Sequence, residues 1–181
     1  LYGGEVVPFT FGNLESGNLS RGHRFMAPES MVIKNAEDYE IQCERHFVSA
    51  DPDKRKAAIA RGIAGAARSV GGTLNEDEDL LEEVTYLVED PTPLVGTFEE
   101  EYLQLPRELL ITSMREHQRY FTVIDKTGKL MPHFITISNT RVEDPAVVVK
   151  GNEKVIRARL SDAMFFWNED RNPYVRFQAY S

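Results

Sequence analysis

The sequence contains a single cysteine, Cys43, and no long apolar run. One cysteine excludes both an internal disulfide and a zinc site built from several cysteines, and we expect Cys43 to be buried as a small apolar side chain. An apolar run of about 18 residues would be needed for a transmembrane helix. The first 25 residues also lack the basic and apolar segments of a secretory signal. These absences predict no membrane association and a location in the reducing cytoplasm.

Common catalytic motifs are missing as well. The sequence has no Walker loop, no dinucleotide-binding fingerprint, no HExxH motif and no GxSxG nucleophile elbow. Its four histidines are scattered, which predicts no metal site. The chain begins with Leu1 and not with Met, and we interpret it as part of a longer polypeptide.

The negative charge is concentrated in one segment. The net charge is −8, yet residues 75–111 hold 12 acidic residues and one basic residue. The remainder of the chain is therefore slightly basic. We call residues 75–111 the acidic segment. A phosphate-binding face is compatible with this composition if the acidic segment points away from that face.

The pattern of apolar residues predicts short strands mixed with helices. Asp51-Pro52 is typical of a helix start and Gly71-Gly72 of a helix end. Because the elements do not alternate regularly, they predict an α+β fold with antiparallel hairpins and several packed helices. We expect one domain over residues 1–171, or two subdomains at about 1–50 and 51–171, followed by a tail at 172–181. The expected strands are 5–11, 21–26, 31–33, 94–98, 120–124 and 133–138, and the expected helices are 36–45, 52–70, 77–85, 106–117 and a region from residue 144 onward.

Three segments have a composition that suits RNA. Guanidinium groups bind phosphates, amides read base edges, and aromatic rings stack on bases. The first segment, RGHRFM at 21–26, places cationic side chains around a glycine. The second, MREHQRYF at 114–121, lies at a helix-to-strand junction, where Tyr120 and Phe121 are expected in the core. The third, at 150–163, is the start of a basic helix. The candidate RNA contacts are Arg21, His23, Arg24, Arg115, His117, Gln118, Arg119, Lys150, Asn152, Lys154 and Arg157.

Structural roles are the alternative for the same residues. The first segment could be a strand edge with ordinary salt bridges. The third could be a surface helix capped by Asn152 and carrying local pairs such as Glu153 with Arg157 and Arg159 with Asp162. A further run of cations along residues 54–68 could be a solvated helix face or a track along an RNA backbone.

Several short motifs follow one another along the chain. They are RGHRFM at 21–26, LEEV at 81–84, LPRELLI at 105–111, HQRYF at 117–121, GKLMP at 128–132 with 134–135, and GNEKVIRARLSDA at 151–163 with 165–166. In this order and at about this spacing, the set resembles the glycyl-tRNA synthetase β subunit family of bacteria. The resemblance covers about residues 5–171, whereas residues 172–181 do not fit it.

The resemblance implies a function in tRNA aminoacylation. In that family an α2β2 enzyme uses its α subunit, with ATP and Mg²⁺, to form glycyl-adenylate, and its β subunit to bind tRNA-Gly. We therefore expect this chain to bind or position tRNA and support assembly, with no cofactor and no catalytic residue of its own. The region also loosely resembles the editing-type domain of the phenylalanyl-tRNA synthetase β subunit. Two alternatives stay open: a subunit-interface module without RNA contact, and a vestigial or active editing-type hydrolytic domain with His23 or His117 as base.

Overall fold

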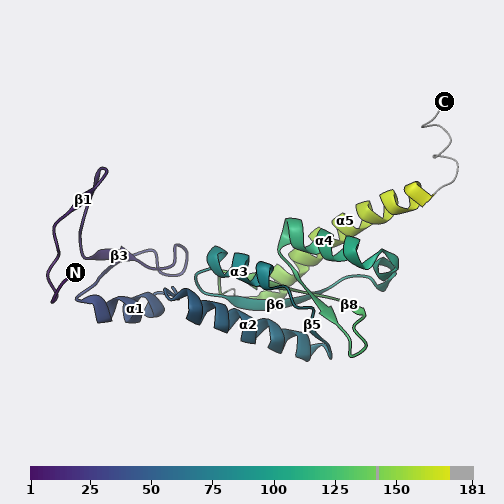
Figure 1. The fold of residues 1–181 in the computed structure, drawn as a ribbon, viewed down its shortest axis with the longest axis horizontal. Coiled ribbons are helices and arrows are strands. Elements are labelled where there is room, and N and C mark those ends of the chain that lie inside the picture. Colours follow the sequence, from purple (N-terminus) through teal and green to yellow (C-terminus); the bar gives the residue numbers. More distant parts are fainter. Residues whose placement is uncertain (142, 172–181) are drawn as a thin grey trace.

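The computed structural model describes residues 1–141 and 143–171. The molecule is elongated, with residues 1–50 at one end, a four-stranded sheet in the middle and the end of the last helix at the other (Figure 1). The fold is α+β with antiparallel sheets, as the sequence predicts. The predicted tail at 172–181 lies outside the described residues.

Residues 1–50 form two small hairpins and a helix. Strand β1 (Thr10–Phe11) pairs with β2 (Leu14–Glu15), and β3 (Leu19–Arg21) pairs with β4 (Ser30–Val32). Helix α1 (Ala36–Arg45) occupies the predicted range. Met31, Ile33 and Cys43 form a small core of their own, so the prediction that Cys43 is buried is confirmed.

The strand predicted at 21–26 is wrong, because the chain turns after Arg21. The backbone N–H groups of Phe25 and Met26 donate to Nδ1 of His23, at 3.3 Å each, which satisfies them within a turn. Gly22 has no room for a side chain, since a Cβ atom there would lie 2.5 Å from Cβ of His46. The strand predicted at 5–11 is likewise reduced to a bridge at residue 5 and the two residues of β1.

The main body is one antiparallel sheet with helices between its strands. Its strand order is β5-β7-β8-β6. The elements are α2 (Pro52–Ser69), β5 (Thr73–Leu74), α3 (Glu78–Leu87), β6 (Thr92–Thr97), the 3-10 helix η1 (Glu100–Gln104), α4 (Arg107–Gln118), β7 (Phe121–Ile124), β8 (Leu130–Ser138) and α5 (Pro145–Arg171).

Local signals fix the helix ends. The carboxylate of Asp51 accepts from the amides of Asp53 and Lys54 at the start of α2, and Asp77 caps α3 in the same way. Gly71 follows α2 with φ +78°, a conformation that glycine adopts without strain. The predicted helices around these residues are therefore confirmed.

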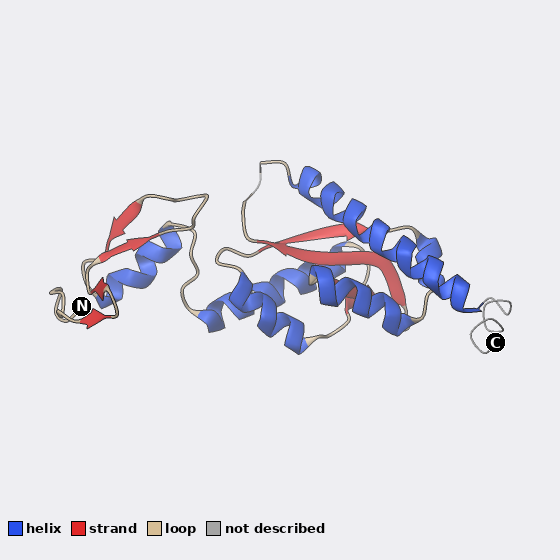
Figure 2. Ribbon diagram, turned by 90° about the horizontal axis from the view of Figure 1, so that it is seen from above, coloured by secondary structure: helices blue, strands red, loops and turns tan. Residues whose placement is uncertain are grey.

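The sheet is covered on both faces, so two cores form (Figure 2). Neighbouring residues of a strand point to opposite faces. Phe121 and Ile135 accordingly pack with α2 and α3, whereas Tyr120 and Phe134 pack with η1, α4 and α5. Ile156 and Leu160 are fully buried in this second core, so α5 packs against the sheet through these side chains.

Candidate functional site

The first candidate segment combines two exposed arginines with a buried histidine. Arg21 is exposed in β3, and the guanidinium of Arg24 lies over the exposed ring of Phe25, 5.6 Å from its centroid. The His23 side chain is fully buried. His23 therefore cannot contact a phosphate on the surface in this conformation.

The second candidate segment lies at the end of α4, against α3. Nε of Arg115 is 2.8 Å from Oδ2 of Asp77, and the nearby Asp77 carboxylate raises the pKa of Arg115 above its ordinary value. Nε of Arg119 is 2.5 Å from Oε1 of Glu83. Because α3 and α4 cover opposite faces of the sheet, these two pairs join the two layers around the edge formed by β5.

Two other residues of this segment are less constrained. His117 is exposed and Gln118 is half-buried. Arg119 itself ends α4 in the left-handed conformation, with φ 53°. A non-glycine residue adopts this region at some cost.

The third candidate segment lies along the middle of α5. Lys150 and Lys154 are exposed one turn apart, and Arg157 donates to Oε1 of Glu99 at 2.5 Å. Glu153 does not pair with Arg157. Its carboxylate accepts from both the backbone N–H and the hydroxyl of Thr97, each at 2.9 Å.

Two further expectations for α5 are wrong. Asn152 is no cap, because α5 begins seven residues earlier at Pro145 and its start is marked by Asp144, which accepts from the Ala146 amide at 3.0 Å. Within the described part of the chain, Arg159 and Asp162 form no ion pair.

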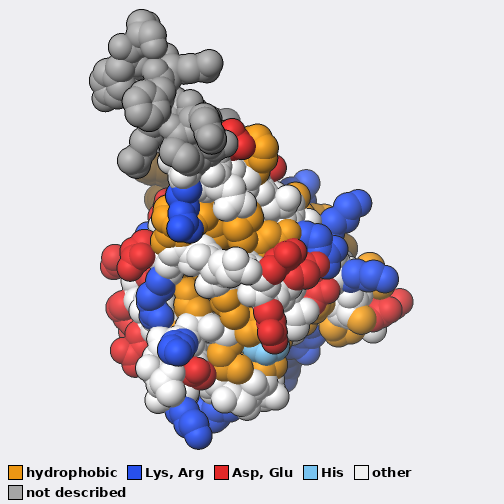
Figure 3. Space-filling model, turned by 90° about the vertical axis from the view of Figure 1, so that its right-hand side faces the viewer, with side chains coloured by type: hydrophobic (Ala, Val, Ile, Leu, Met, Phe, Trp, Pro, Cys, Tyr) orange, Lys and Arg blue, Asp and Glu red, His pale blue; other side chains and the backbone are white. Residues whose placement is uncertain are grey.

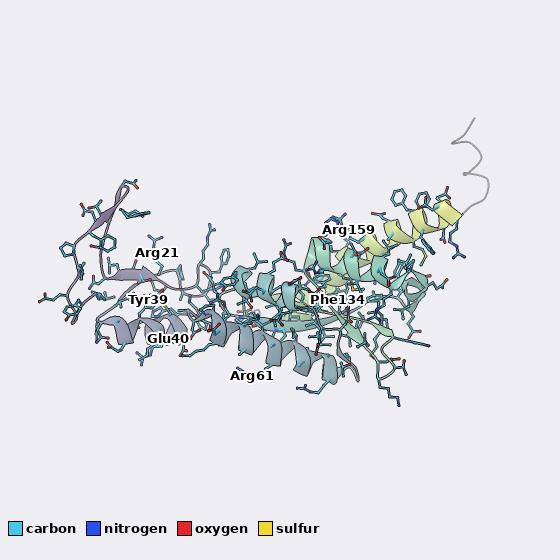
Figure 4. The ribbon with its side chains drawn as sticks, viewed as in Figure 1. Arg21, Tyr39, Glu40, Arg61, Phe134 and Arg159 are labelled. Carbon is cyan, nitrogen blue, oxygen red and sulfur yellow. The ribbon has the colours of Figure 1, made fainter. Side chains whose placement is uncertain are left out.

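The structure brings the second and third segments together and leaves the first apart. The hydroxyl of Tyr120 donates to Oδ1 of Asn152 at 2.9 Å, which joins the end of α4 to the middle of α5. Figure 4 shows Arg21 and Arg159 on distant parts of the molecule. The candidate residues therefore do not form one continuous site.

The acidic segment does not point away from the candidate cations. Its residues Asp77, Glu83 and Glu99 pair with Arg115, Arg119 and Arg157. Figure 3 shows Lys and Arg side chains interspersed with acidic and hydrophobic ones on the face that it displays. Among the eleven candidates, Arg21, Arg24, Lys150 and Lys154 are cations that form no ion pair within the described residues.

The cations of α2 are mostly occupied as well. Lys54 pairs with Glu40, and Lys56 pairs with Glu78 and Glu82. Arg55 donates to the backbone oxygens of Ser49 and Thr85. Only Arg61 and Arg68 of the predicted track are exposed without such a partner among the described residues, so α2 offers no continuous basic track.

A cavity of about 350 Å³ surrounds the buried His23 and was not foreseen from the sequence. Its other walls include Phe25, Tyr86, Glu89 and Asn139. Tyr86 and Glu89 belong to the acidic segment, and Asn139 follows β8. Their approach to His23 depends on the tertiary fold, so local composition gave no signal for them beyond the exposed position of Tyr86 on its helix.

Residues 1–141 and 143–171 contain neither a cluster of metal ligands nor a membrane-spanning helix. No group of three or more His, Cys, Asp or Glu side chains is placed to hold a metal ion. No described helix combines the length and apolar character that crossing a membrane requires.

Comparisons with known proteins identify relatives over nearly the whole chain. A family model described as "Glycyl-tRNA synthetase beta subunit" matches residues 1–178. The chain is 62% identical over 171 residues to the glycine–tRNA ligase beta subunit of Syntrophotalea carbinolica and 61% identical over 171 residues to that of Geotalea uraniireducens. It is 57% identical over 179 residues to that of Citrifermentans bemidjiense. These alignments cover 94%, 94% and 99% of this chain but 25%, 25% and 26% of the relatives.

The matched proteins define the class as subunits of aminoacyl-tRNA synthetases. The chain belongs to the glycyl-tRNA synthetase beta subunit family, which confirms the resemblance drawn from its motifs. It spans about a quarter of the length of the curated relatives it matches. The family match extends to residue 178, further than the resemblance that we expected to end near residue 171.

Proposed function

We propose that this chain binds and positions tRNA-Gly within a cytoplasmic glycine–tRNA ligase of α2β2 composition. Formation of glycyl-adenylate, with ATP and Mg²⁺, takes place in the α subunit. Membership of the family supports the ligase. The tRNA contact is supported by one observation, the pair of exposed lysines Lys150 and Lys154 on α5.

The two lysines are favoured because neither has an acidic partner among the described residues. They lie at i and i+4 on α5, so their side chains share one face of the helix. An arginine that already holds a carboxylate must lose that contact before it can bind a phosphate, whereas a solvated lysine loses only water. We therefore assign the phosphate contacts to Lys150 and Lys154 and treat Arg115, Arg119 and Arg157 mainly as supports of the fold.

The double substitution Lys150→Gln/Lys154→Gln tests this assignment in the ligase that contains this chain. Each lost phosphate contact should lower the slope of log affinity against log salt by about one. We expect weaker tRNA-Gly binding and a slope smaller by about two, measured by filter binding over a salt series. Lys126→Gln/Lys129→Gln, in the exposed turn between β7 and β8, is the matched control with the same change in charge.

A subunit-interface role is the second candidate, and a specific observation favours it. Large apolar side chains are exposed on residues 1–41, including Tyr2 (83%), Phe11 (79%) and Leu19 (69%). Contiguous exposed apolar surface is typical of protein–protein contacts. Equal affinity and equal salt slope for the two double variants would remove the phosphate assignment and favour this interface role.

A vestigial or active editing-type hydrolytic domain, with a histidine as general base, is the third reading. A general base needs a free lone pair directed at its substrate. In His23 the lone pair of Nδ1 already accepts from the amides of Phe25 and Met26, so Nε2 is the protonated nitrogen of the neutral ring. This arrangement suits a hydrogen-bond donor better than a base.

A further inference from the structure

The cavity around His23 lies between the N-terminal residues and the main body. It has a volume of about 350 Å³, within the range of sites that bind small organic groups. The turn after β3 contributes His23, Arg24 and Phe25, the end of α3 contributes Tyr86 and Glu89, and Asn139 completes the wall.

The inner wall presents an unsatisfied donor beside an acceptor. Nε2 of His23 is buried and has no hydrogen-bond partner within residues 1–141 and 143–171. Its nearest acidic neighbour is Oε2 of Glu89, at 3.6 Å, which is too long for a direct hydrogen bond. The Glu89 side chain is half exposed, so its carboxylate can also accept from a bound group. Buried polar groups without partners are uncommon, and the pair therefore suits a ligand with an acceptor next to a donor.

The rim is aromatic and basic. The side chains of Phe25 and Tyr86 are 74% and 66% exposed, and the Arg24 guanidinium lies 5.6 Å from the centroid of the Phe25 ring. Exposed rings beside a cation are typical of surfaces on which unpaired bases stack.

Contacts across the junction hold the cavity in shape. Arg55 donates to the Ser49 and Thr85 backbone oxygens, and Oδ1 of Asn139 accepts from the Glu89 amide at 2.6 Å. Arg141 pairs with Asp90 at 2.7 Å. These contacts join the end of α3 to Asn139 and to the residues that follow α1, so little ordering of these walls is needed when a ligand binds.

We propose that this cavity binds one unstacked nucleobase of the bound tRNA. The Watson–Crick edge of a base carries an acceptor next to an N–H donor. The N–H group of His23 Nε2 would donate a hydrogen bond to the acceptor of the base, and the N–H group of the base would donate to the Glu89 carboxylate. Phe25 and Tyr86 would stack on the base, and Arg24 would contact the adjoining phosphate. This inference rests on the proposed function, because it requires a bound tRNA.

Phe25→Ala and Tyr86→Ala test the cavity in the ligase that contains this chain. Stacking of one base on an aromatic ring accounts for about a tenfold change in affinity or more. We expect each variant to bind tRNA-Gly about tenfold more weakly with an unchanged salt slope, because no phosphate contact of either ring is removed. Phe166→Ala, which removes a ring that is 65% exposed and lies outside the cavity, is the matched control and should bind normally.

Ultraviolet cross-linking gives a second and direct measurement. Irradiation of the wild-type complex, followed by mass spectrometry, should yield a nucleotide adduct on the peptide that contains Phe25 or Tyr86, and its mass identifies the base. The adduct should be lost from the alanine variants.

The outcomes separate this proposal from the proposed function. Normal affinity of both cavity variants and no adduct on either peptide would overturn the nucleobase site. The lysine assignment on α5 would still stand if Lys150→Gln/Lys154→Gln weakened binding in the same assay. An equal loss of affinity in Phe166→Ala would also overturn the nucleobase site, because the effect would then not belong to the cavity.

Discussion

The hydroxyl of Tyr120 joins two candidate RNA-binding segments, the one at the end of α4 and the one on α5, and its removal tests this connection. It donates to Asn152 at 2.9 Å, while the Tyr120 ring stacks on Phe134 with centroids 4.4 Å apart. Tyr120→Phe keeps the ring and removes only the hydroxyl. A net hydrogen bond of this kind contributes about 1 kcal/mol. Because Asn152 is half-buried, water can reach part of the amide and the cost should not rise far above that figure.

Thermal unfolding at neutral pH measures this cost. A loss of about 1 kcal/mol corresponds to a decrease of about 2–4 °C in Tm for a chain of this size. Asn152→Ala should lower the Tm to a similar extent. The double variant should lose less than the sum of the two, since both changes remove the same bond.

The same prediction includes the pH dependence of the difference in Tm between the wild type and Tyr120→Phe. Burial raises the pKa of Tyr120 to about 12 from the ordinary value of 10.0. Between about pH 10 and pH 12, the folded protein therefore keeps the hydroxyl proton of Tyr120, whereas the unfolded chain loses it. Stability from this group is complete below pH 10 and decreases as the pH rises from 10 to 12. Tyr120→Phe cannot show this loss, so its Tm should approach that of the wild type in alkali.

Tyr86→Phe is the matched control, because it removes a hydroxyl from a residue that is 66% exposed. It should leave the Tm nearly unchanged at neutral pH and should follow the wild type in alkali. An equal decrease in Tm for Tyr86→Phe and Tyr120→Phe, or a difference from wild type that does not narrow above pH 10, would refute the reasoning.

Two further predictions concern the stability of the sheet. Gly96→Ala should destabilise the fold by about 1–3 kcal/mol in urea unfolding, because the new Cβ would lie 2.2 Å from Phe134. Gly151→Ala is the control: it has open space on α5 and should stabilise the fold by up to about 1 kcal/mol. Equal effects of the two substitutions on the free energy of unfolding would contradict the steric argument. Burial lowers the pKa of His133 below 6.5, so this residue contributes stability above about pH 6.5 that is lost as the pH falls; His133→Gln should therefore show a weaker decrease in Tm between pH 7 and pH 5, and an unchanged pH profile would exclude the effect.

The helices of the main body could be predicted because their signals are local. Asp51 and Asp77 cap the helices that directly follow them, and Gly71 ends α2. The hairpin of β7 and β8 was predictable for the same reason, since the Asp125 carboxylate organises the turn between the strands through the amides of Thr127 and Lys129.

The turn at His23 could not be predicted, because its causes lie elsewhere in the chain. Gly22 packs against His46, whose backbone oxygen also accepts from the His23 amide at 2.8 Å. The alternating residue types at 21–26 are typical of a strand when the contact with His46 is not known. The cavity at His23 was missed for the same reason, since Glu89 reaches it only through the tertiary fold.

The ion pairs of the candidate site show how tertiary contacts replace the expected local ones. Helical spacing favoured a pair between Glu153 and Arg157, worth about 0.3–0.5 kcal/mol. In the fold, Glu153 instead accepts two hydrogen bonds from Thr97 on the edge strand β6, and Arg157 pairs with Glu99. A backbone N–H on a sheet edge needs a partner, so the carboxylate satisfies more donors there than it would on the helix surface.

The acidic segment therefore stabilises the fold through ion pairs, a role that the net charge alone does not reveal. Six of its 12 acidic residues form ion pairs with lysine or arginine in the part of the chain that the structure describes, and three of these pairs use arginines that composition had assigned to RNA. Arginine suits this role because its planar fork holds carboxylates in fixed geometry, whereas lysine is a flexible, strongly hydrated charge. Screening by salt confines the electrostatic repulsion between the exposed acidic side chains and a phosphate to about 8–10 Å. A chain of net charge −8 can thus still present Lys150 and Lys154 to a phosphate backbone, provided that tRNA approaches along α5.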